Sequence, residues 1–416
     1  MKSVVVELIN TGSELLLGRV VNTNASWLGR RLFDVGIRIA RQTVVPDGIE
    51  ILQAMREASS RADVVIVSGG LGPTSDDVTR EALCELCHVS MSEDERVLAR
   101  LRERFLKRNI PMSPSNLKQA LVPQGALVLD NDEGTAPGLL MPHDEESGCP
   151  TIILLPGPPS ELKPMVERFV VPFFSLLVEG DVPSMLEYRI VGLGESALQD
   201  RVDAQLSKIF GLEWGYCART GEVDVRLIGN HEALDAATNL LKESVGRFIL
   251  TPQGASLEGA IVAHLRQKGK TVTTAESCTG GLIAKRITDV SGASEIFHYG
   301  WVTYANEAKE SQLGVHASTL DSYGAVSTQV VAEMAEGALR LSGADYAVAV
   351  SGIAGPDGGT DEKPVGTVCF AWAIRGGETR VKMACYPGSR ESFRQMVSQV
   401  ALTGILQLTR EGEIIF

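Results

Sequence analysis

The chain has 416 residues, a length at which two or three domains are expected. Its formal net charge of −13, without any basic run, argues against direct contact with nucleic acid, because phosphate binding needs an excess of basic side chains. The seven cysteines lack secretory spacing, and no segment reads as a signal peptide or membrane span, so we expect a cytoplasmic protein with reduced thiols.

The first part of the chain alternates strand-like and helix-like runs. In order they are Val4–Ile9 (strand), Thr23–Asp34 (helix), Arg38–Val45 (strand), Ile49–Ser60 (helix), Val64–Val67 (strand), Asp77–Cys87 and Glu93–Lys107 (helices), Thr151–Leu155 (strand) and a helix closing near Leu177. This alternation predicts an α/β domain with a doubly wound, mostly parallel sheet. Cys84 and Cys87 form one C-x-x-C in a helical run; a zinc site would need a second pair, so zinc is the less favoured reading.

A glycine-rich loop joins the strand ending at Val67 to the next helix. It contains Gly69, Gly70, Gly72, Pro73 and Thr74. Its glycines let backbone amides approach a ligand, and a helix start favours phosphate. Asp76 and Asp77 would repel a bare phosphate, which a divalent cation between them would resolve. Capping of the helix N-terminus is the alternative role for the two carboxylates.

Two linker-like segments, Glu179–Pro183 and Thr251–Ala255, bracket a small α+β module. Its expected elements are a strand at Glu187–Val191, a helix at Ala197–Leu206, strands at Glu213–Cys217 and Glu222–Ile228, and a helix at Leu234–Val245. We therefore expect three domains, at residues 1–178, 183–250 and 255–416. The module between the linkers carries no readable function.

The most informative segment of the last domain is a tight turn between a strand-like run, Lys270–Thr274, and a helical run, Leu282–Val290. Such a turn exposes the hydroxyl of Ser277, and the amides of Thr279, Gly280 and Gly281 lie at a helix N-terminus, where they can donate hydrogen bonds to an anionic oxygen. The alternative is that Ser277 or Thr279 only caps the helix.

Two more polar turns follow strand-like runs. Tyr304 to Lys309 comes after Ile296–Thr303, and Ser351 to Gly359, which includes Gly352, comes after Tyr346–Val350. Open α/β sheets bind ligands where such turns converge, so the three turns predict one crevice. A last helix is expected from Ser389 to Thr409.

These turns, together with Pro364–Thr367 and the stretch to Arg394, resemble the C-terminal domain of the CinA family, the nicotinamide mononucleotide amidohydrolase type. The resemblance implies a three-layer α/β/α domain that needs no cofactor. It also implies that Ser277 is the nucleophile and that Tyr304 and Lys309 support it. The family usually has threonine where this chain has Ser351, which keeps the hydroxyl.

The residue chemistry agrees with a serine amidase that lacks a histidine base. A serine hydroxyl needs a neighbour able to take its proton; Lys309 can serve if burial depresses its pKa, and Tyr304 can relay the proton. Cys278 is the rival nucleophile but has no evident histidine partner. His298 reads as a partly buried strand residue. One of the two arginines Arg390 and Arg394 is a candidate for the substrate phosphate, with a solvated helix arginine as the alternative.

The N-terminal part resembles the molybdopterin-binding-like domain of full-length CinA proteins. The matching pieces are Thr11–Gly18, Asn22–Asn24, the glycine loop, Pro111–Met112 with Asn116 and Gln119–Ala120, Gly134–Gly138 and Leu155–Pro159. The resemblance implies an ADP-ribose pyrophosphatase that uses Mg, Mn or Co. It places Asp76 and Asp77 at the metal, Glu14 and Asn24 in the pocket, and Gly69 to Thr74 around the diphosphate.

The family resemblance further implies a homodimer that recycles pyridine nucleotides, with nicotinamide mononucleotide and ADP-ribose as substrates. A hypothesis from another class stays open. The front domain would then be a binding module for molybdopterin without hydrolase activity, and the chain would be an adaptor in competence or DNA-damage response.

Overall fold

The structure is a computed structural model that describes residues 4–144, 148–178, 180, 182–250, 255–412 and 414. It divides into two compact units, Met1–Pro183 and Ser184–Phe416. Most of the predicted linker Thr251–Ala255, and residues 179 and 181 of the predicted linker Glu179–Pro183, lie outside the described residues. The second unit holds both the middle module and the C-terminal domain.

The first unit is built on a six-stranded sheet with the order β2-β1-β3-β8-β7-β6. The strands are β1 (Val6–Thr11), β2 (Ile39–Val45), β3 (Val64–Ser68), β6 (Leu127–Leu129), β7 (Gly138–Met141) and β8 (Thr151–Leu155). The first three and β8 are parallel, while β7 and β6 are antiparallel additions at one edge. Every residue of β1, β3 and β8 is buried, as expected for parallel strands covered on both faces.

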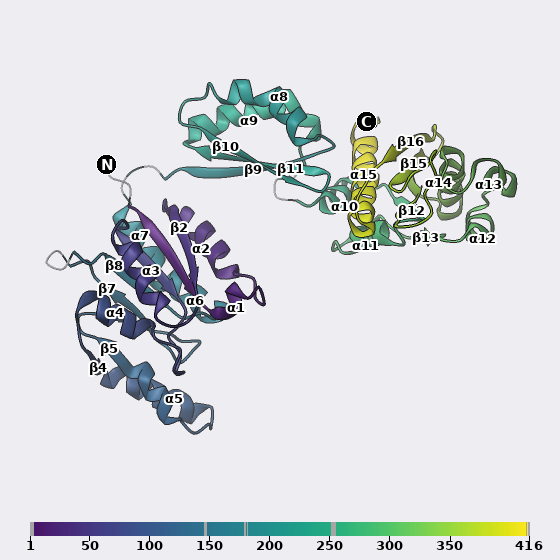
Figure 1. The fold of residues 1–416 in the computed structure, drawn as a ribbon. Coiled ribbons are helices and arrows are strands. Elements are labelled where there is room, and N and C mark those ends of the chain that lie inside the picture. The colour runs from purple at the N-terminus through teal and green to yellow at the C-terminus, as the bar shows by residue number, and fades with distance from the viewer. Residues whose placement is uncertain are drawn as a thin grey trace. The chain divides into compact units, whose positions relative to one another are not determined.

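Helices cover both faces of this sheet (Figure 1). One face packs against α2 (Thr23–Phe33), α6 (Pro159–Met165) and α7 (Val171–Leu177), and the other against α3 (Glu50–Ser59), α4 (Thr79–Cys87) and α5 (Glu95–Lys107). The predicted doubly wound, mostly parallel arrangement is confirmed. Sequence reasoning missed a short helix α1 (Ser13–Leu16), the antiparallel strands β6 and β7, and the small pair β4 (Met91–Glu93) and β5 (Leu121–Pro123).

The middle module is a three-stranded antiparallel sheet with the order β10-β11-β9 and two helices packed on one face. Its elements are β9 (Ser184–Val191), α8 (Glu195–Leu206), β10 (Glu213–Arg219), β11 (Glu222–Gly229) and α9 (His231–Val245). The predicted order of strand, helix, strand, strand and helix is confirmed, with each element one to three residues longer at one end or both.

The C-terminal domain has a five-stranded sheet with the order β13-β12-β14-β15-β16. Strands β12 (Val272–Glu276), β13 (Gly300–Val302) and β14 (Tyr346–Gly352) are parallel, and β15 (Thr367–Ile374) and β16 (Arg380–Cys385) are antiparallel. Helices α10 (Leu257–Lys268), α11 (Leu282–Thr288) and α15 (Arg390–Glu411) cover one face, and α13 (Ala317–Tyr323) and α14 (Thr328–Ser342) the other (Figure 1). This is the predicted three-layer α/β/α architecture.

Two strand predictions near the site are wrong in their bounds. Only Gly300–Val302 of the expected strand Ile296–Thr303 pairs; Ile296 is in a turn that follows the 3-10 turn at Ala293–Glu295, and residues 297–299 have no regular structure. His298 is therefore exposed, not a partly buried strand residue. Strand β12 lies two residues later than expected, which puts Glu276 inside the strand and directly before the turn.

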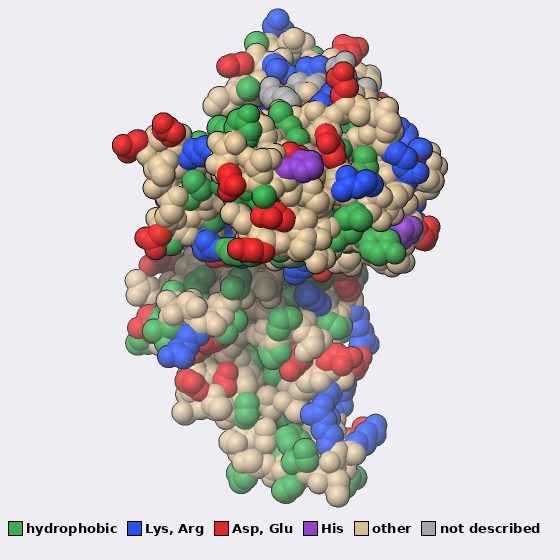
Figure 2. Space-filling view, turned by 90° about the vertical axis from the view of Figure 1, so that its right-hand side faces the viewer, with side chains coloured by type: hydrophobic (Ala, Val, Ile, Leu, Met, Phe, Trp, Pro, Cys, Tyr) green, Lys and Arg blue, Asp and Glu red, His purple; other side chains and the backbone are tan. Residues whose placement is uncertain are grey.

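No helix among the described residues is long and apolar enough to cross a membrane. On the face drawn in Figure 2, acidic and basic side chains are interspersed.

Candidate functional site

The three predicted turns of the C-terminal domain leave neighbouring parallel strands at one edge of the sheet. Glu276, the last residue of β12, pairs with Val302 of β13 and with Val350 of β14. The amide of Ser277 donates to the carbonyl of Val350 at 3.0 Å, and the amide of Thr303 donates to that of Glu276 at 2.9 Å. The structure therefore brings the turns that begin at residues 277 and 303 and the end of β14 together.

The turn after β12 is held from inside by Glu276. This carboxylate is fully buried and accepts hydrogen bonds from the Thr279 hydroxyl (2.7 Å) and from the amides of Ile283 (3.0 Å) and Ala284 (2.8 Å). Helix α11 thus has its first amides satisfied by Glu276, and its N-cap, Gly281, has no side-chain cap. Neither Ser277 nor Thr279 caps the helix, which removes the alternative role for Ser277.

Few polar groups in the turn after β12 are left to bind a substrate. The amide of Gly280 donates to the Ser277 carbonyl at 3.1 Å, so it already has a partner within the turn, and its predicted substrate contact stays a prediction. The amides of Thr279 and Gly281, and the hydroxyl of Ser277, have no hydrogen-bond partner among the described residues. Gly280 and Gly281 have φ of +58° and +90°, a left-handed path that favours glycine. The turn therefore presents the Ser277 hydroxyl and, among its amides, those of Thr279 and Gly281 as unpaired donors.

Arg394 of α15 supports the turn from the outside. Its Nε and Nη2 atoms donate to the Thr279 carbonyl at 3.1 and 2.6 Å. The predicted phosphate contact therefore competes with a structural one, because two of the three guanidinium nitrogens already hold the backbone. Ser351 is buried and is the second-last residue of β14, and Gly352 is the last residue of that strand. A Cβ on Gly352 would lie 3.1 Å from the ring of Phe393, so glycine allows α15 to pack close.

Lys309 lies at the start of a π-helical turn (Lys309–Leu313) and is 1% exposed. Its ammonium donates to the carbonyls of Thr303 (2.9 Å), Tyr304 (3.3 Å) and Ala305 (3.5 Å). Burial lowers the pKa of Lys309, as a proton acceptor would require, but no hydrogen bond joins it to Ser277 among the described residues. Three carbonyl acceptors suit the charged amine, so deprotonation of Ser277 by Lys309 requires at least one of these bonds to break.

Tyr304 is exposed, and its phenol oxygen accepts a hydrogen bond from Nη2 of Arg390 at 2.6 Å. Nη1 of Arg390 donates to the Gly355 carbonyl at 3.0 Å, so this arginine links two of the three turns. Cys278 is 4% exposed, and burial raises the pKa of its thiol to about 12. A thiol in that state is a poor nucleophile near neutral pH, which favours Ser277 over Cys278.

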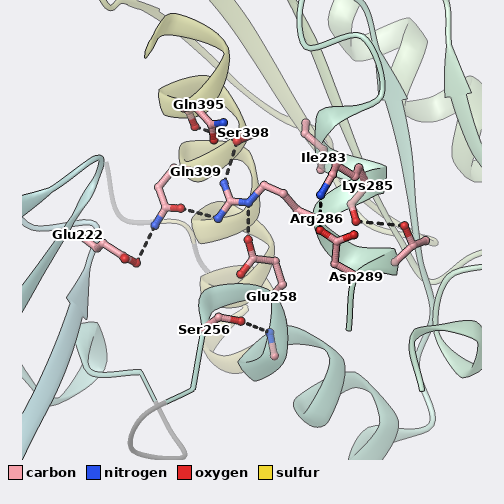
Figure 3. Close-up of polar contacts among 12 residues, drawn as sticks. Glu222, Ser256, Glu258, Ile283, Lys285, Arg286, Asp289, Gln395, Ser398 and Gln399 are labelled. Carbon is pink, nitrogen blue, oxygen red and sulfur yellow. Dashed lines mark hydrogen bonds and ion pairs between the residues drawn. The ribbon is translucent and has the colours of Figure 1, made fainter. Parts of the chain in front are cut away.

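The helix that follows the turn is anchored by Arg286 (Figure 3). Arg286 of α11 donates to Ser398 (2.8 Å) and Gln399 (2.7 Å) of α15 and forms an ion pair with Glu258 of α10. Gln399 in turn donates to Glu222 of β11 at 3.2 Å. The residues that sequence reasoning missed at this site are Glu276 and Arg286. An acidic residue directly before a helix-opening turn is a signal that could have identified Glu276.

The N-terminal domain has its own pocket at the carboxyl ends of β1 and β3. It has a volume of about 110 Å³ and is lined in part by Asn10, Thr11, Glu14, Asn24 and Ser68. Oδ1 and Nδ2 of Asn10, the Thr11 hydroxyl and Oδ1 of Asn24 are buried and have no hydrogen-bond partner among the described residues. Because unpaired buried polar atoms are costly, their concentration on one pocket indicates a polar ligand. Sequence reasoning had found Glu14 and Asn24 but missed Asn10 and Thr11.

The glycine loop beside this pocket is braced by α4. Buried Arg80 donates to the carbonyls of Leu71 and Gly72, each at 3.0 Å, and the Thr79 hydroxyl donates to that of Gly69 at 3.0 Å. The amide of Gly69 donates to Leu155, whereas the amides of Gly70 and Gly72 have no partner among the described residues. A Cβ at Gly69 would lie 2.4 Å from the Thr11 hydroxyl, so the loop needs glycine there.

Asp77 closes the loop instead of capping α4, because it accepts from the amide (2.9 Å) and hydroxyl of Thr74. Asp76 is exposed. No cluster of three or more His, Cys, Asp or Glu that could hold a metal is present in the described part of the chain. Magnesium commonly binds one or two carboxylates together with substrate phosphates and water, and Asp76 and Asp77 provide two carboxylates. Pro73 and Thr74 complete the loop.

Comparisons with known proteins agree with both domains. Residues 254–409 match the CinA C-terminal domain, and residues 7–175 match the probable molybdopterin binding domain. A CinA-like protein of Akkermansia muciniphila is 60% identical over 414 residues, 100% of each chain. A putative competence-damage inducible protein of Symbiobacterium thermophilum is 47% identical over 384 residues, 89% of each chain.

Among solved structures, the competence/damage inducible protein CihA from Agrobacterium tumefaciens is 46% identical over 35% of this chain and 89% of its own, with a TM-score of 0.35. The full-length similarity to the Akkermansia protein decides the assignment. The chain belongs to the CinA family, with an N-terminal domain of the molybdopterin-binding type and a CinA C-terminal domain.

Proposed function

We propose that the C-terminal domain hydrolyses the carboxamide of nicotinamide mononucleotide to nicotinate mononucleotide and ammonia. The observation that carries this proposal is the turn after β12, where the Ser277 hydroxyl has no internal partner and stands beside the unpaired amides of Thr279 and Gly281. A nucleophile next to two amide donors is what acyl transfer from an amide requires. Membership of the CinA family is consistent with a hydrolase.

In the proposed reaction, Oγ of Ser277 attacks the carboxamide carbon, and the oxyanion that forms accepts hydrogen bonds from the amides of Thr279 and Gly281. Neutral Lys309, which has lost one proton to solvent and with it one carbonyl acceptor, takes the serine proton and passes it to the departing ammonia. Water then cleaves the acyl-enzyme. Tyr304 and Arg390, already hydrogen-bonded to each other, stand at the neighbouring turn, where the phenol can relay a proton.

Ammonia release from nicotinamide mononucleotide by Ser277→Ala tests the assignment. We expect kcat to fall by about 10³-fold or more, because the covalent step is lost, with little change in Tm. Cys278→Ala is the matched control and should keep most activity, since its thiol is buried and protonated. Turnover by Ser277→Ala at the wild-type rate, or loss only in Cys278→Ala, would overturn the proposal.

We further propose that the N-terminal domain hydrolyses ADP-ribose to AMP and ribose 5-phosphate. The unpaired buried groups of Asn10, Thr11 and Asn24 favour a polar ligand, and the free amides of Gly70 and Gly72 favour its phosphates. Asp76 and Asp77 would hold a divalent cation (Mg, Mn or Co), which supplies charge neutralisation for the diphosphate. Glu14 lines the same pocket.

AMP formation from ADP-ribose, measured with and without each cation, tests this second activity. We expect metal-dependent turnover that falls at least tenfold in Asp76→Asn and is unchanged in Ser277→Ala. Tight pterin binding with no AMP under any metal would instead support a binding module and the adaptor hypothesis.

A further inference from the structure

The C-x-x-C cysteines of α4 have a third thiol beside them, contributed by a distant part of the chain. Cys87 is the last residue of α4, and its Sγ lies 2.8 Å from Sγ of Cys149, 62 residues later. None of the three cysteines is in a disulfide, and Cys84, one helical turn before Cys87, has no sulfur hydrogen bond among the described residues. The spatial partner of Cys87 is therefore Cys149, not its neighbour in the C-x-x-C.

We propose that Cys87 and Cys149 form a reversible disulfide when the protein meets a peroxide. Neither the amidase nor the pyrophosphatase activity requires this site, because its residues belong to neither set of candidate site residues. The two sulfur atoms are already in contact, so forming the bond needs little movement of the backbone. Cys87 is partly exposed and Cys149 is 7% exposed, so a small oxidant can approach while large thiols are hindered.

The pKa values of the two thiols shift in opposite directions, and this difference indicates which sulfur attacks the peroxide and which one then closes the disulfide. A hydrogen bond from the Cys87 thiol lowers the pKa of Cys149, while the same contact and burial raise the pKa of Cys87. The Cys149 thiolate attacks one peroxide oxygen, the O–O bond breaks, and a sulfenic acid and hydroxide form. The Cys87 sulfur then displaces the sulfenic oxygen, which leaves as water with the thiol proton. Two thiols and one hydrogen peroxide thus give one disulfide and two waters.

The bond would join two elements that both contact the glycine loop. Helix α4 carries Thr79 and Arg80, which hold the glycine loop, and Cys149 stands two residues before β8, whose last residue accepts the amide of Gly69. A cross-link over this span restricts the unfolded chain, so the oxidised protein should have the higher Tm.

The test is thiol mapping of the reduced full-length protein after brief exposure to hydrogen peroxide. Remaining thiols are blocked with N-ethylmaleimide, and the digest is analysed without reduction. We expect a Cys87–Cys149 peptide, two of the seven cysteines protected, and reversal by dithiothreitol. Cys84→Ser is the matched control and should form the same bond, whereas Cys149→Ala and Cys149→Ser should not.

A Cys84–Cys87 peptide, or sulfinic acids without any cross-link, would overturn the proposal. The mapping of the wild-type protein stands even if a Cys149 variant fails to fold. A second readout is Tm: oxidation should raise it by several degrees in the wild type and in Cys84→Ser, and leave it unchanged in Cys87→Ser. An equal rise in Cys87→Ser would also contradict the assignment.

Discussion

The two candidate sites use the same local design, a buried parallel strand followed by a glycine turn and a helix, but they leave different groups without partners. After β12, the buried Glu276 occupies the helix amides and the Ser277 hydroxyl stays free. After β3, Arg80 and Thr79 hold the loop carbonyls, and the unpaired groups are amides of the loop and side chains of β1 and α2. The two sites therefore share one supersecondary unit, and they differ in which polar atoms have no hydrogen-bond partner among the described residues.

The substitution with the largest expected effect on this comparison is Glu276→Gln. Glutamine keeps one acceptor but places an NH2 against groups that donate, so the turn loses at least one bond. We expect the free energy of unfolding to fall by about 1–3 kcal/mol and kcat for ammonia release to fall by about 100-fold as the turn geometry is lost. The control is Glu258→Gln, a partly buried acid paired with Arg286, which should lower stability with a much smaller effect on kcat. Equal losses of kcat in both variants would show that Glu276 has no special link to the turn.

A smaller effect, which depends on pH, is expected from Lys309. Because burial lowers its pKa, kcat/KM for the amidase should rise about tenfold per pH unit in the neutral range and level off below the ordinary lysine pKa of about 10.4. Between the folded and ordinary values the unfolded chain binds more protons, so stability also rises with pH in that window. A pH-independent kcat/KM from neutral to mildly alkaline conditions would exclude Lys309 as the base.

The smallest expected effect concerns ligand binding in the N-terminal pocket. Thr11→Val removes an unpaired buried hydroxyl without changing its shape. We expect KM for ADP-ribose to rise about five- to tenfold, while the free energy of unfolding stays constant or increases slightly. Thr79→Val is the counterpart, because that hydroxyl donates to Gly69, and it should lose stability instead. Reversed behaviour of the two variants would mean that the pocket does not take a ligand near Thr11.

The sequence predicted the order of strands and helices well because periodic burial is a local property. The bounds of Thr151–Leu155 are identical in the structure, and those of most other elements differ by one to three residues. The turn after β12 was likewise predicted from a short local pattern, whereas Glu14 and Asn24, which line the N-terminal pocket, came from the resemblance to CinA proteins. The strand at Ile296 was misplaced because its apolar run packs as a turn, with Ile296 buried in the core.

Contacts between distant segments could not be predicted from one sequence. The bond from Arg394 to Thr279 spans 115 residues, and Arg394 was instead considered for the substrate phosphate. Asn10 and Thr11 lie in a strand whose residues are all buried, and only their unpaired polar atoms distinguish them from core residues. The pattern of a strand shows that a residue is buried, but not whether its polar atoms are satisfied.

Helix α15 also determines where this protein can be divided. Besides Arg394 it carries Gln399, which reaches Glu222, and Arg410, which donates to the carbonyl of Ile249. Val191 and Leu250 belong to the same buried cluster as α10 and α15, although they precede the region matched by the family. A fragment begun at residue 254 would open that hydrophobic cluster to water, so an expression boundary at Ser184 is the one that keeps the second compact unit intact.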